Sequence, residues 1–398
     1  ACTAHKINPK SIAVTWGSTT TFTYNGSAQA PTITTPVSGV TGESISLTRT
    51  TQTNANQESN PTYTSTASIA SVTGGRATAA NYKLTGNTKS FVINKANATN
   101  PTLTAYTGTY NGSSHTIGVS GGSGGTIQYS TDNSTWSTTK PTRTTAGTTT
   151  VYVRVLGDSN HNTTSSINAK ITINKATPTV TLSATTGTAT NAAPSVTFTE
   201  KASIAGSFSN TSGTTSVATV TPASYTSVAA NTAKTVTVAG VGTGKSTISA
   251  KFTPTDTANY ATVTKTYTVT SDITLPKWSL VSATTETTSK TATPLEIITL
   301  KIKGTDDSGS STSTLTNDNI KVYINGSLVT PSNKGISATA GITGGKEYTI
   351  LISGINSAGS MTVIIDAGTL TDAVGNVSTE ASITTGITIR KYTASEVT

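Results

Sequence analysis

Apolar and polar residues alternate with a period of two along most of the chain. In residues 151–155, Val151, Val153 and Val155 fall on one face, and Tyr152 and Arg154 fall on the other. Residues 234–238 and 266–270 repeat the pattern. Such alternation predicts strands with one buried face. Threonine, which is abundant throughout, supports this prediction because its branched β-carbon fits a pleated strand better than a helix.

Turn signals separate these segments. Asn-Gly pairs stand at 25–26, 111–112 and 325–326, and Asn-Pro pairs stand at 60–61 and 100–101. Many short strands with frequent turns are typical of antiparallel sandwiches. The sequence therefore predicts an all-β protein without long helices.

Internal repeats divide the chain. Thr23-Tyr24-Asn25-Gly26-Ser27 returns at 109–113, and Ile93-Asn94-Lys95-Ala96 returns at 173–176. Short connections between repeats favour a stiff array. We therefore expect tandem immunoglobulin-like β-sandwiches forming an elongated rod, with domains at 1–95, 96–175, 176–270 and a larger one at 271–398.

The repeats carry a family resemblance. Val14-Thr15-Trp16, followed by residues 22–32, resembles the opening of bacterial immunoglobulin-like repeats of the MBG/YDG type, as do residues 127–155. The third repeat, with residues 218–220 and 242–250, is similar to bacterial Big repeats, and residues 364–376 resemble the final strands of modules in large adhesins. One departure is Tyr-Asn-Gly where the family often has Tyr-Asp-Gly. The resemblance implies a secreted or cell-surface bacterial protein that acts as a stalk or display module and not as an enzyme.

Composition narrows the function classes. Charged residues make up 11% of the chain, against about 25% in typical domains, so we expect modest cores and a largely uncharged surface. No apolar stretch is long enough for a membrane span. The single cysteine, Cys2, excludes a disulfide framework, although it could also be the lipid attachment point of a lipoprotein. No Gly-x-Ser-x-Gly elbow stands in a helical context, so nothing indicates an esterase-type nucleophile.

Charge is unevenly distributed. Residues 1–270 hold 17 Lys and Arg against 6 Asp and Glu, whereas residues 271–398 hold 9 against 11. This asymmetry suits head-to-tail self-association or contact with other surface proteins, and the basic part suits an anionic polysaccharide. The basic residues are scattered singly and lack an RNA-type aromatic motif, so we expect no nucleic-acid binding.

Acidic residues gather in the fourth domain. Asp306, Asp307, Asp366 and Asp372 are candidate Ca²⁺ ligands, because Ca²⁺ prefers several oxygen ligands and loop carboxylates can converge to provide them. The alternative is that these residues only form turns.

Two further chemistries are candidates. Gram-positive surface sandwiches are known for Lys–Asn or Thr–Gln cross-links that a buried acid catalyses, but acids are few in the first three domains. Trp16, Trp136 and Trp278 could form a sugar-stacking platform, but we expect them in the sandwich cores. We therefore predict a non-catalytic structural or adhesive protein, a stalk or fibre subunit. The alternative is an adhesin that recognises a ligand or glycan through loops of domain 4.

Overall fold

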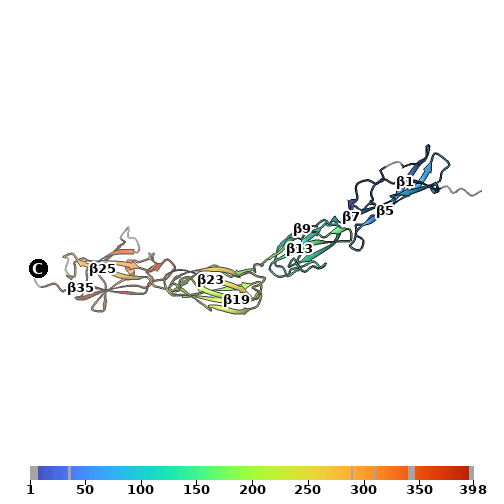
Figure 1. Cartoon of the computed structure of the whole chain (residues 1–398). Helices are drawn as coiled ribbons and strands as arrows, with labels where there is room; N and C mark the ends of the chain where they lie inside the picture. The colour runs from blue at the N-terminus through green and yellow to red at the C-terminus, as the bar shows by residue number, and fades with distance from the viewer. Residues whose placement is uncertain (1–7, 35–36, 288–289, 309–310, 339–345, 394–398) are drawn as a thin grey trace, which may run out of the picture. The chain divides into compact units, whose positions relative to one another are not determined.

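The computed structural model describes residues 8–34, 37–287, 290–308, 311–338 and 346–393, so Cys2 lies outside the described residues. Regular structure in these ranges is β-strand apart from two 3-10 helices, η1 (Ala79–Asn81) and η2 (Asn317–Asn319). The prediction of an all-β fold of tandem sandwiches is confirmed. The chain divides into two compact units, 1–176 and 177–398, and each unit contains two sandwiches (Figure 1). None of the described helices has the length and apolarity to cross a membrane.

The first unit holds the first and second sandwiches. In the first, the strands form a five-stranded sheet in the order β2-β7-β5-β4-β3 and a β1-β6 pair. In the second, they form a four-stranded sheet in the order β10-β15-β13-β12 and the pairs β9-β11 and β8-β14. The strands of the first sandwich are β1 (Lys10–Ala13), β2 (Thr21–Thr23), β3 (Val37–Ser38), β4 (Ser44–Arg49), β5 (Tyr63–Thr73), β6 (Tyr82–Thr85) and β7 (Thr88–Asn94). Those of the second are β8 (Ala96–Asn97), β9 (Thr102–Thr104), β10 (Tyr106–Thr109), β11 (Gly118–Ser120), β12 (Gly125–Ser130), β13 (Gly147–Gly157), β14 (His161–Asn162) and β15 (Ile167–Asn174).

The second unit holds the third and fourth sandwiches, each with a four-stranded and a five-stranded sheet. The sheet orders are β16-β18-β22-β20 and β17-β24-β23-β19-β21 in the third, and β25-β27-β32-β31 and β26-β35-β33-β29-β30 in the fourth, which also has a β28-β34 pair. The strands of the third sandwich are β16 (Val180–Leu182), β17 (Thr186–Thr190), β18 (Ser195–Ala202), β19 (Gly206–Ser212), β20 (Ala218–Thr221), β21 (Ser224–Val228), β22 (Lys234–Gly240), β23 (Gly244–Pro254) and β24 (Val263–Asp272). Those of the fourth are β25 (Lys277–Thr285), β26 (Thr291–Ala292), β27 (Ile298–Thr305), β28 (Ser311–Ser313), β29 (Ile320–Ile324), β30 (Ser327–Val329), β31 (Asn333–Ala338), β32 (Lys346–Ser353), β33 (Gly359–Ile365), β34 (Leu370–Asp372) and β35 (Ala381–Ile389).

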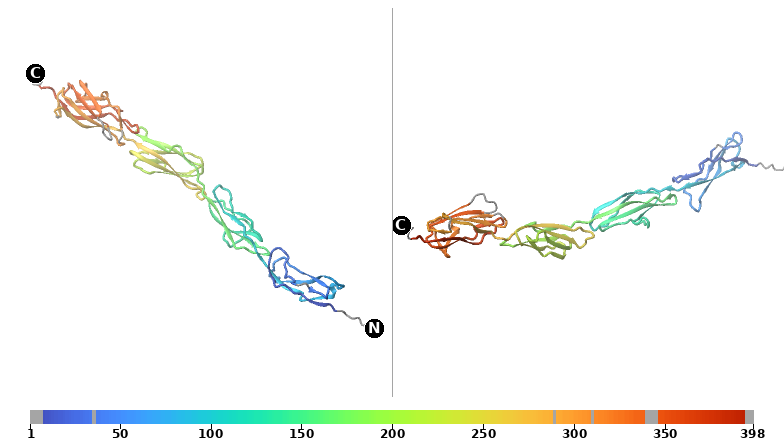
Figure 2. Two further views of the ribbon diagram at one scale, coloured as in Figure 1. Left: turned by 90° about the horizontal axis from the view of Figure 1, so that it is seen from above. Right: turned by 60° about the vertical axis from the view of Figure 1, so that its left-hand side comes forward.

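Each sandwich contains a parallel pair that the alternation pattern does not predict. A short strand near the start of the sandwich pairs in parallel with its last strand: β2 with β7, β10 with β15, β17 with β24, and β26 with β35. The longer neighbouring strands pair antiparallel, for example β13 with β15. Because this early strand and the last strand run in the same direction, the chain enters a sandwich at one end and leaves it at the other. Figure 2 shows the strands of each sandwich from two further directions.

The sequence repeats have repeated structural roles. Asn25 and Asn111 each accept a hydrogen bond at 2.9 Å on the side-chain oxygen from the backbone of the serine two residues later. Gly26 and Gly112, which stand between the asparagine and the serine of each turn, adopt φ values of +77° and +80°. The turn requires this conformation, and residues with a side chain disfavour it. Tyr24 precedes the first of these turns and donates its backbone N–H to the carbonyl of Asn94, the last residue of β7. Tyr110 precedes the second turn and donates in the same way to Asn174, the last residue of β15. The repeated segments therefore attach the opening of each of these sandwiches to its last strand.

The cores follow the predicted alternation. Val151, Val153 and Val155 are fully buried, while Tyr152 and Arg154 are half-buried on the other face of β13. Trp278 is 6% exposed, as expected of a core residue. The core prediction is wrong for Trp16 and Trp136, which are only half-buried. The ring of Trp136 lies 4.2 Å from the guanidinium carbon of Arg154, and the indole N–H of Trp16 donates to the carbonyl of Gly86.

Candidate metal centre

Three aspartates from separate strands meet in the second unit. Asp272 ends β24 of the third sandwich, Asp306 follows β27 of the fourth, and Asp372 ends β34. One carboxylate oxygen from each residue lies within 4.8 Å of those of the other two. We call this group the three-aspartate cluster. It contains two of the four residues that the sequence singled out, together with Asp272, which sequence reasoning missed.

The other two candidates lie outside the three-aspartate cluster. Asp307 is exposed. Asp366 forms an ion pair with Lys321, whose Nζ lies 2.5 Å from Oδ1 of the aspartate. Lys321 therefore already neutralises Asp366, and Asp307 remains in water.

A tight loop positions Asp372. Its Oδ1 accepts hydrogen bonds from the backbone N–H of Val374 at 2.9 Å and of Asn376 at 2.8 Å. Gly375 makes the loop possible, because the backbone there has a φ of +97°. The Oδ2 of Asp372 accepts from the side-chain amide of Asn376 at 2.7 Å. The Asp-Ala-Val-Gly-Asn segment thus fixes the direction of this carboxylate.

Asp272 is held from one side only. Its Oδ1 accepts from the hydroxyl groups of Thr243 at 3.2 Å and Thr274 at 2.8 Å, and from the backbone N–H of Thr274 at 3.3 Å. Its Oδ2 is buried and has no hydrogen-bond partner, and the residue as a whole is 1% exposed. Burial of an unpaired carboxylate oxygen is costly unless another group satisfies it.

Asp306 has the same one-sided arrangement. Its Oδ2 accepts from the backbone N–H of Ser308 at 2.8 Å and from the hydroxyl of Ser308, while its buried Oδ1 has no partner. In the described parts of the chain, no Lys, Arg or His forms an ion pair with any member of the cluster. The three carboxylates could therefore hold a cation with oxygen ligands, of the type that Ca²⁺ prefers.

The cluster lies beside a set of hydrogen bonds between the third and fourth sandwiches, which we call the C-terminal joint. Asn376 of the fourth sandwich donates its side-chain amide to the backbone carbonyls of Asp272 at 2.8 Å and Thr274 at 2.9 Å. Its Oδ1 accepts from the backbone N–H of Asn191, in the loop after β17, at 2.8 Å. Asn376 is 5% exposed. One buried side chain therefore connects both sandwiches to the segment that joins them.

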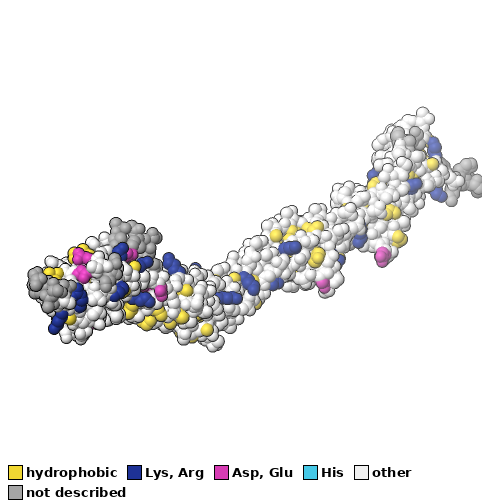
Figure 3. Space-filling view, turned by 90° about the vertical axis from the view of Figure 1, so that its left-hand side faces the viewer, with side chains coloured by type: hydrophobic (Ala, Val, Ile, Leu, Met, Phe, Trp, Pro, Cys, Tyr) yellow, Lys and Arg dark blue, Asp and Glu magenta, His cyan; other side chains and the backbone are white. Residues whose placement is uncertain are grey.

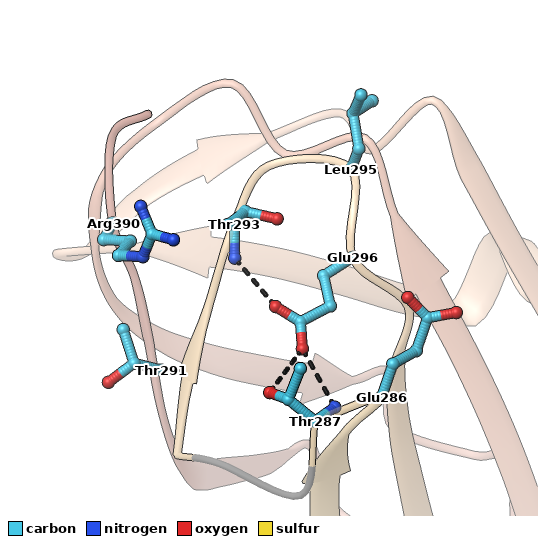
Figure 4. Close-up of a pocket in the computed structure, with 7 residues that line it drawn as sticks. All are labelled: Glu286, Thr287, Thr291, Thr293, Leu295, Glu296 and Arg390. Atoms are coloured by element: carbon cyan, nitrogen blue, oxygen red, sulfur yellow. Dashed lines mark hydrogen bonds between the residues drawn. The ribbon is translucent and has the colours of Figure 1, made fainter. Parts of the chain in front are cut away.

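A polar cavity in the fourth sandwich is a different kind of site. It has a volume of ≈ 570 Å³ and is lined by Glu286, Thr287, Thr291, Thr293, Leu295, Glu296 and Arg390. Figure 4 shows the carboxylate of Glu296 turned toward Thr287 and Thr293, whose backbone N–H groups each donate to it at 3.1 Å. Burial opposes ionisation of Glu296, but hydrogen bonds from these threonines outweigh it and lower the pKa of the carboxyl. This carboxylate therefore connects Thr287 with Thr293 across the loop.

A buried acid also lies between the two sheets of the third sandwich. Glu200 on β18 is fully buried, and its Oε1 accepts from the side-chain amide of Asn210 on β19 at 3.1 Å. Burial raises the pKa of Glu200 to about 7, and the hydrogen bond from Asn210 only partly offsets that rise. A Lys–Asn cross-link needs a lysine amine at the asparagine, and the described residues place no lysine within hydrogen-bonding distance of Asn210.

Comparisons with known proteins carry no argument about this chain. No family model matches the sequence, and no curated protein matches it. Among solved structures, domains 1–6 of the surface layer protein SbsC are 15% identical, with 89% of this chain and 50% of that chain covered at a TM-score of 0.23. The D00-D0 domains of intimin are 13% identical, with 44% and 98% covered at a TM-score of 0.20. Scores this low carry no argument, so the fold assignment rests on the sheets described above.

Proposed function

We propose that this chain is a non-catalytic structural protein of the bacterial surface or extracellular space, in which tandem sandwiches act as a stalk or fibre subunit. The observation that carries the proposal is that, within each unit, an asparagine side chain bonds one sandwich to its neighbour. A stalk needs such bonds, because sandwiches on a free linker would reorient independently. The family resemblance of the repeats supports the same function.

We call the bonds between the first and second sandwiches the N-terminal joint. As in the C-terminal joint, an asparagine side chain accepts a backbone N–H from the neighbouring sandwich. Oδ1 of Asn160 in the second sandwich accepts from the backbone N–H of Ala55 in the first at 2.8 Å. Gln57 donates its side-chain amide to the carbonyl of Ser159 at 2.9 Å. The His161 ring meets the Tyr24 ring edge to face, with centroids 5.2 Å apart. Ala55 is fully buried, so its N–H depends on Asn160 for an acceptor.

The surface favours a structural protein over a ligand-binding one. Figure 3 shows Lys and Arg side chains spread singly over the visible face, between large areas of uncharged residues. Charges scattered in this way form no concentrated field that would attract a charged ligand. Self-association, with the basic part of one copy against the weakly acidic fourth sandwich of another, remains our proposal for assembly. Anionic polysaccharide ranks behind it as a partner, because no basic patch is concentrated on that face.

Replacing Asn160 with Ala tests the proposed function at the N-terminal joint. The variant leaves the buried N–H of Ala55 without an acceptor, which costs about 1–3 kcal/mol. We expect the Ala55 amide to exchange its hydrogen about 5–150 times faster in the full chain, as measured by NMR or mass spectrometry.

Asn168→Ala provides the matched control, because Asn168 is an exposed residue of β15 in the same sandwich. In this variant the Ala55 amide should exchange its hydrogen at the wild-type rate. An Ala55 amide that exchanges freely in the wild-type chain would show that the sandwiches are not fixed to each other, and the proposed function would lose its basis.

A further inference from the structure

We infer that the three-aspartate cluster is a Ca²⁺ site that stabilises the C-terminal joint. The inference deepens the proposed function, on which it rests, by naming a ligand that controls one joint. Its chemistry depends only on Asp272, Asp306 and Asp372 and on the groups around them.

The first argument is electrostatic. Three carboxylates with ligand atoms within 4.8 Å of one another repel, and no described cationic side chain pairs with them. Repulsion of this kind between partly buried groups is strong because water screens it poorly. A divalent cation at the centre of the cluster converts the repulsion into attraction.

The second argument comes from the unpaired oxygens. Asp272 Oδ2 and Asp306 Oδ1 are both buried and have no hydrogen-bond partner, and Asp272 is 99% buried. The other oxygen of each carboxylate is fixed by threonine or serine groups. Each side chain is thus held in place with one oxygen free, which is the arrangement of a metal ligand and not of a turn residue.

The third argument concerns the choice of ion. All the side-chain ligands are carboxylate oxygens, which favours Ca²⁺, Mg²⁺ or Mn²⁺ over Zn²⁺, since Zn²⁺ prefers nitrogen and sulfur. Two oxygens bound to one Ca²⁺ at about 2.3–2.6 Å lie at most about 5 Å apart, so oxygens within 4.8 Å of one another can share one Ca²⁺. Ca²⁺ also accepts the irregular geometry that carboxylates from different segments offer, whereas Mg²⁺ demands a near-ideal octahedron.

The fourth argument is the position of the site. Asp272 belongs to the third sandwich, and Asp306 and Asp372 belong to the fourth. Asn376 bonds both the carboxylate of Asp372 and the backbone of Asp272. An ion shared by the three carboxylates would therefore hold together the same segments that Asn376 connects.

The test is titration of the metal-free full chain with CaCl₂ in a calorimeter, followed by thermal unfolding in 1 mM CaCl₂ and in EDTA. We expect one Ca²⁺ per chain and a midpoint about 2–4 °C higher with Ca²⁺ for the second unit, as binding to the folded state requires. Asp272→Asn should bind no Ca²⁺ at this site. In EDTA it should melt at or above the wild-type midpoint, because it removes one of three repelling charges.

Two further variants keep the test decisive. Asp307→Asn is the matched control, because this exposed neighbour of Asp306 lies outside the cluster and its removal should leave binding unchanged. Asp306→Asn replaces Asp272→Asn if the latter does not fold. Absence of Ca²⁺ binding by the wild type, Ca²⁺ binding that survives in Asp272→Asn, or binding of Mg²⁺ in preference to Ca²⁺ would each overturn the inference. None of these outcomes affects the Asn160 experiment, which concerns a joint without the cluster.

Discussion

Replacing Glu200 with Gln is expected to stabilise the third sandwich by about 3 kcal/mol at pH 8 and to leave its stability unchanged near pH 4. The pKa of the buried carboxyl rises from an ordinary 4.5 to about 7, and each pKa unit corresponds to about 1.4 kcal/mol. Because the folded-state pKa is raised, the contribution of Glu200 to stability is fully present below pH 4.5. It is lost as the pH rises to about 7, since the unfolded chain ionises first.

The geometry explains why the neutral form suits this place. Oε2 of Glu200 and Oδ1 of Asn210 are both buried without a hydrogen-bond partner. A protonated Glu200 supplies an O–H that can donate to Asn210 while Asn210 donates to Oε1. A glutamine at position 200 supplies an N–H for the same purpose at every pH, so the variant removes the pH dependence and keeps the bonds.

Hydrogen exchange of β18 and β19 in the full chain measures this effect. The ratio of wild-type to variant rates at each pH cancels the intrinsic pH dependence of exchange, and we expect it to rise from about 1 at pH 4 to more than 100 at pH 8. Glu58→Gln, at an exposed position of the first sandwich, should give a ratio near 1 throughout. Equal rates for wild type and Glu200→Gln at pH 8 would show that burial does not raise the pKa of Glu200.

Replacing Asn376 with Ala is expected to lower the free energy of opening of the C-terminal joint by about 3–5 kcal/mol. The substitution removes the acceptor of the Asn191 N–H and the donor to the carbonyls of Asp272 and Thr274. Each buried polar group left unsatisfied costs about 1–3 kcal/mol, and the losses in one network are not additive. It also removes the donor to Asp372, which increases the repulsion within the three-aspartate cluster.

The backbone N–H of Asn191 reports this change directly, because its acceptor is the side-chain oxygen of Asn376 in the fourth sandwich. We expect its exchange to accelerate at least 100-fold in the variant. Asn333→Ala, at an exposed position of β31 in the same sandwich, is the control and should leave the rate unchanged. An Asn191 amide that is equally protected in both variants would show that the joint does not depend on Asn376.

The local structure could be predicted well from the sequence, because period-two alternation and turn residues act over a few residues. Val151–Val155 and the Asn-Gly turns after β2 and β10 are examples. The parallel pairing of β2 with β7 could not be predicted this way, since it joins segments about 70 residues apart and leaves no local pattern. The positions of Trp16 and Trp136 were predicted wrongly because both residues lie outside the strands, where no alternation pattern indicates whether a side chain is buried.

The candidate site shows the same division. Asp306 and Asp372 could be selected because acidic residues concentrate in the fourth domain. Asp272 stands at the end of an alternating strand, at the boundary between two domains. An acidic residue at such a boundary is the only feature of the sequence that could have marked it as a candidate ligand. Only the packing of the third sandwich against the fourth brings it to the others.

Distance measurement across the C-terminal joint tests the central claim, that side chains fix neighbouring sandwiches to each other. Spin labels would be placed at the exposed positions Lys251 on β23 and Leu328 on β30, each replaced by Cys in a Cys2→Ser background. Double electron–electron resonance in 1 mM CaCl₂ should give one narrow distance distribution, which broadens in Asn376→Ala. A distribution that is equally broad with and without Asn376 would contradict the account.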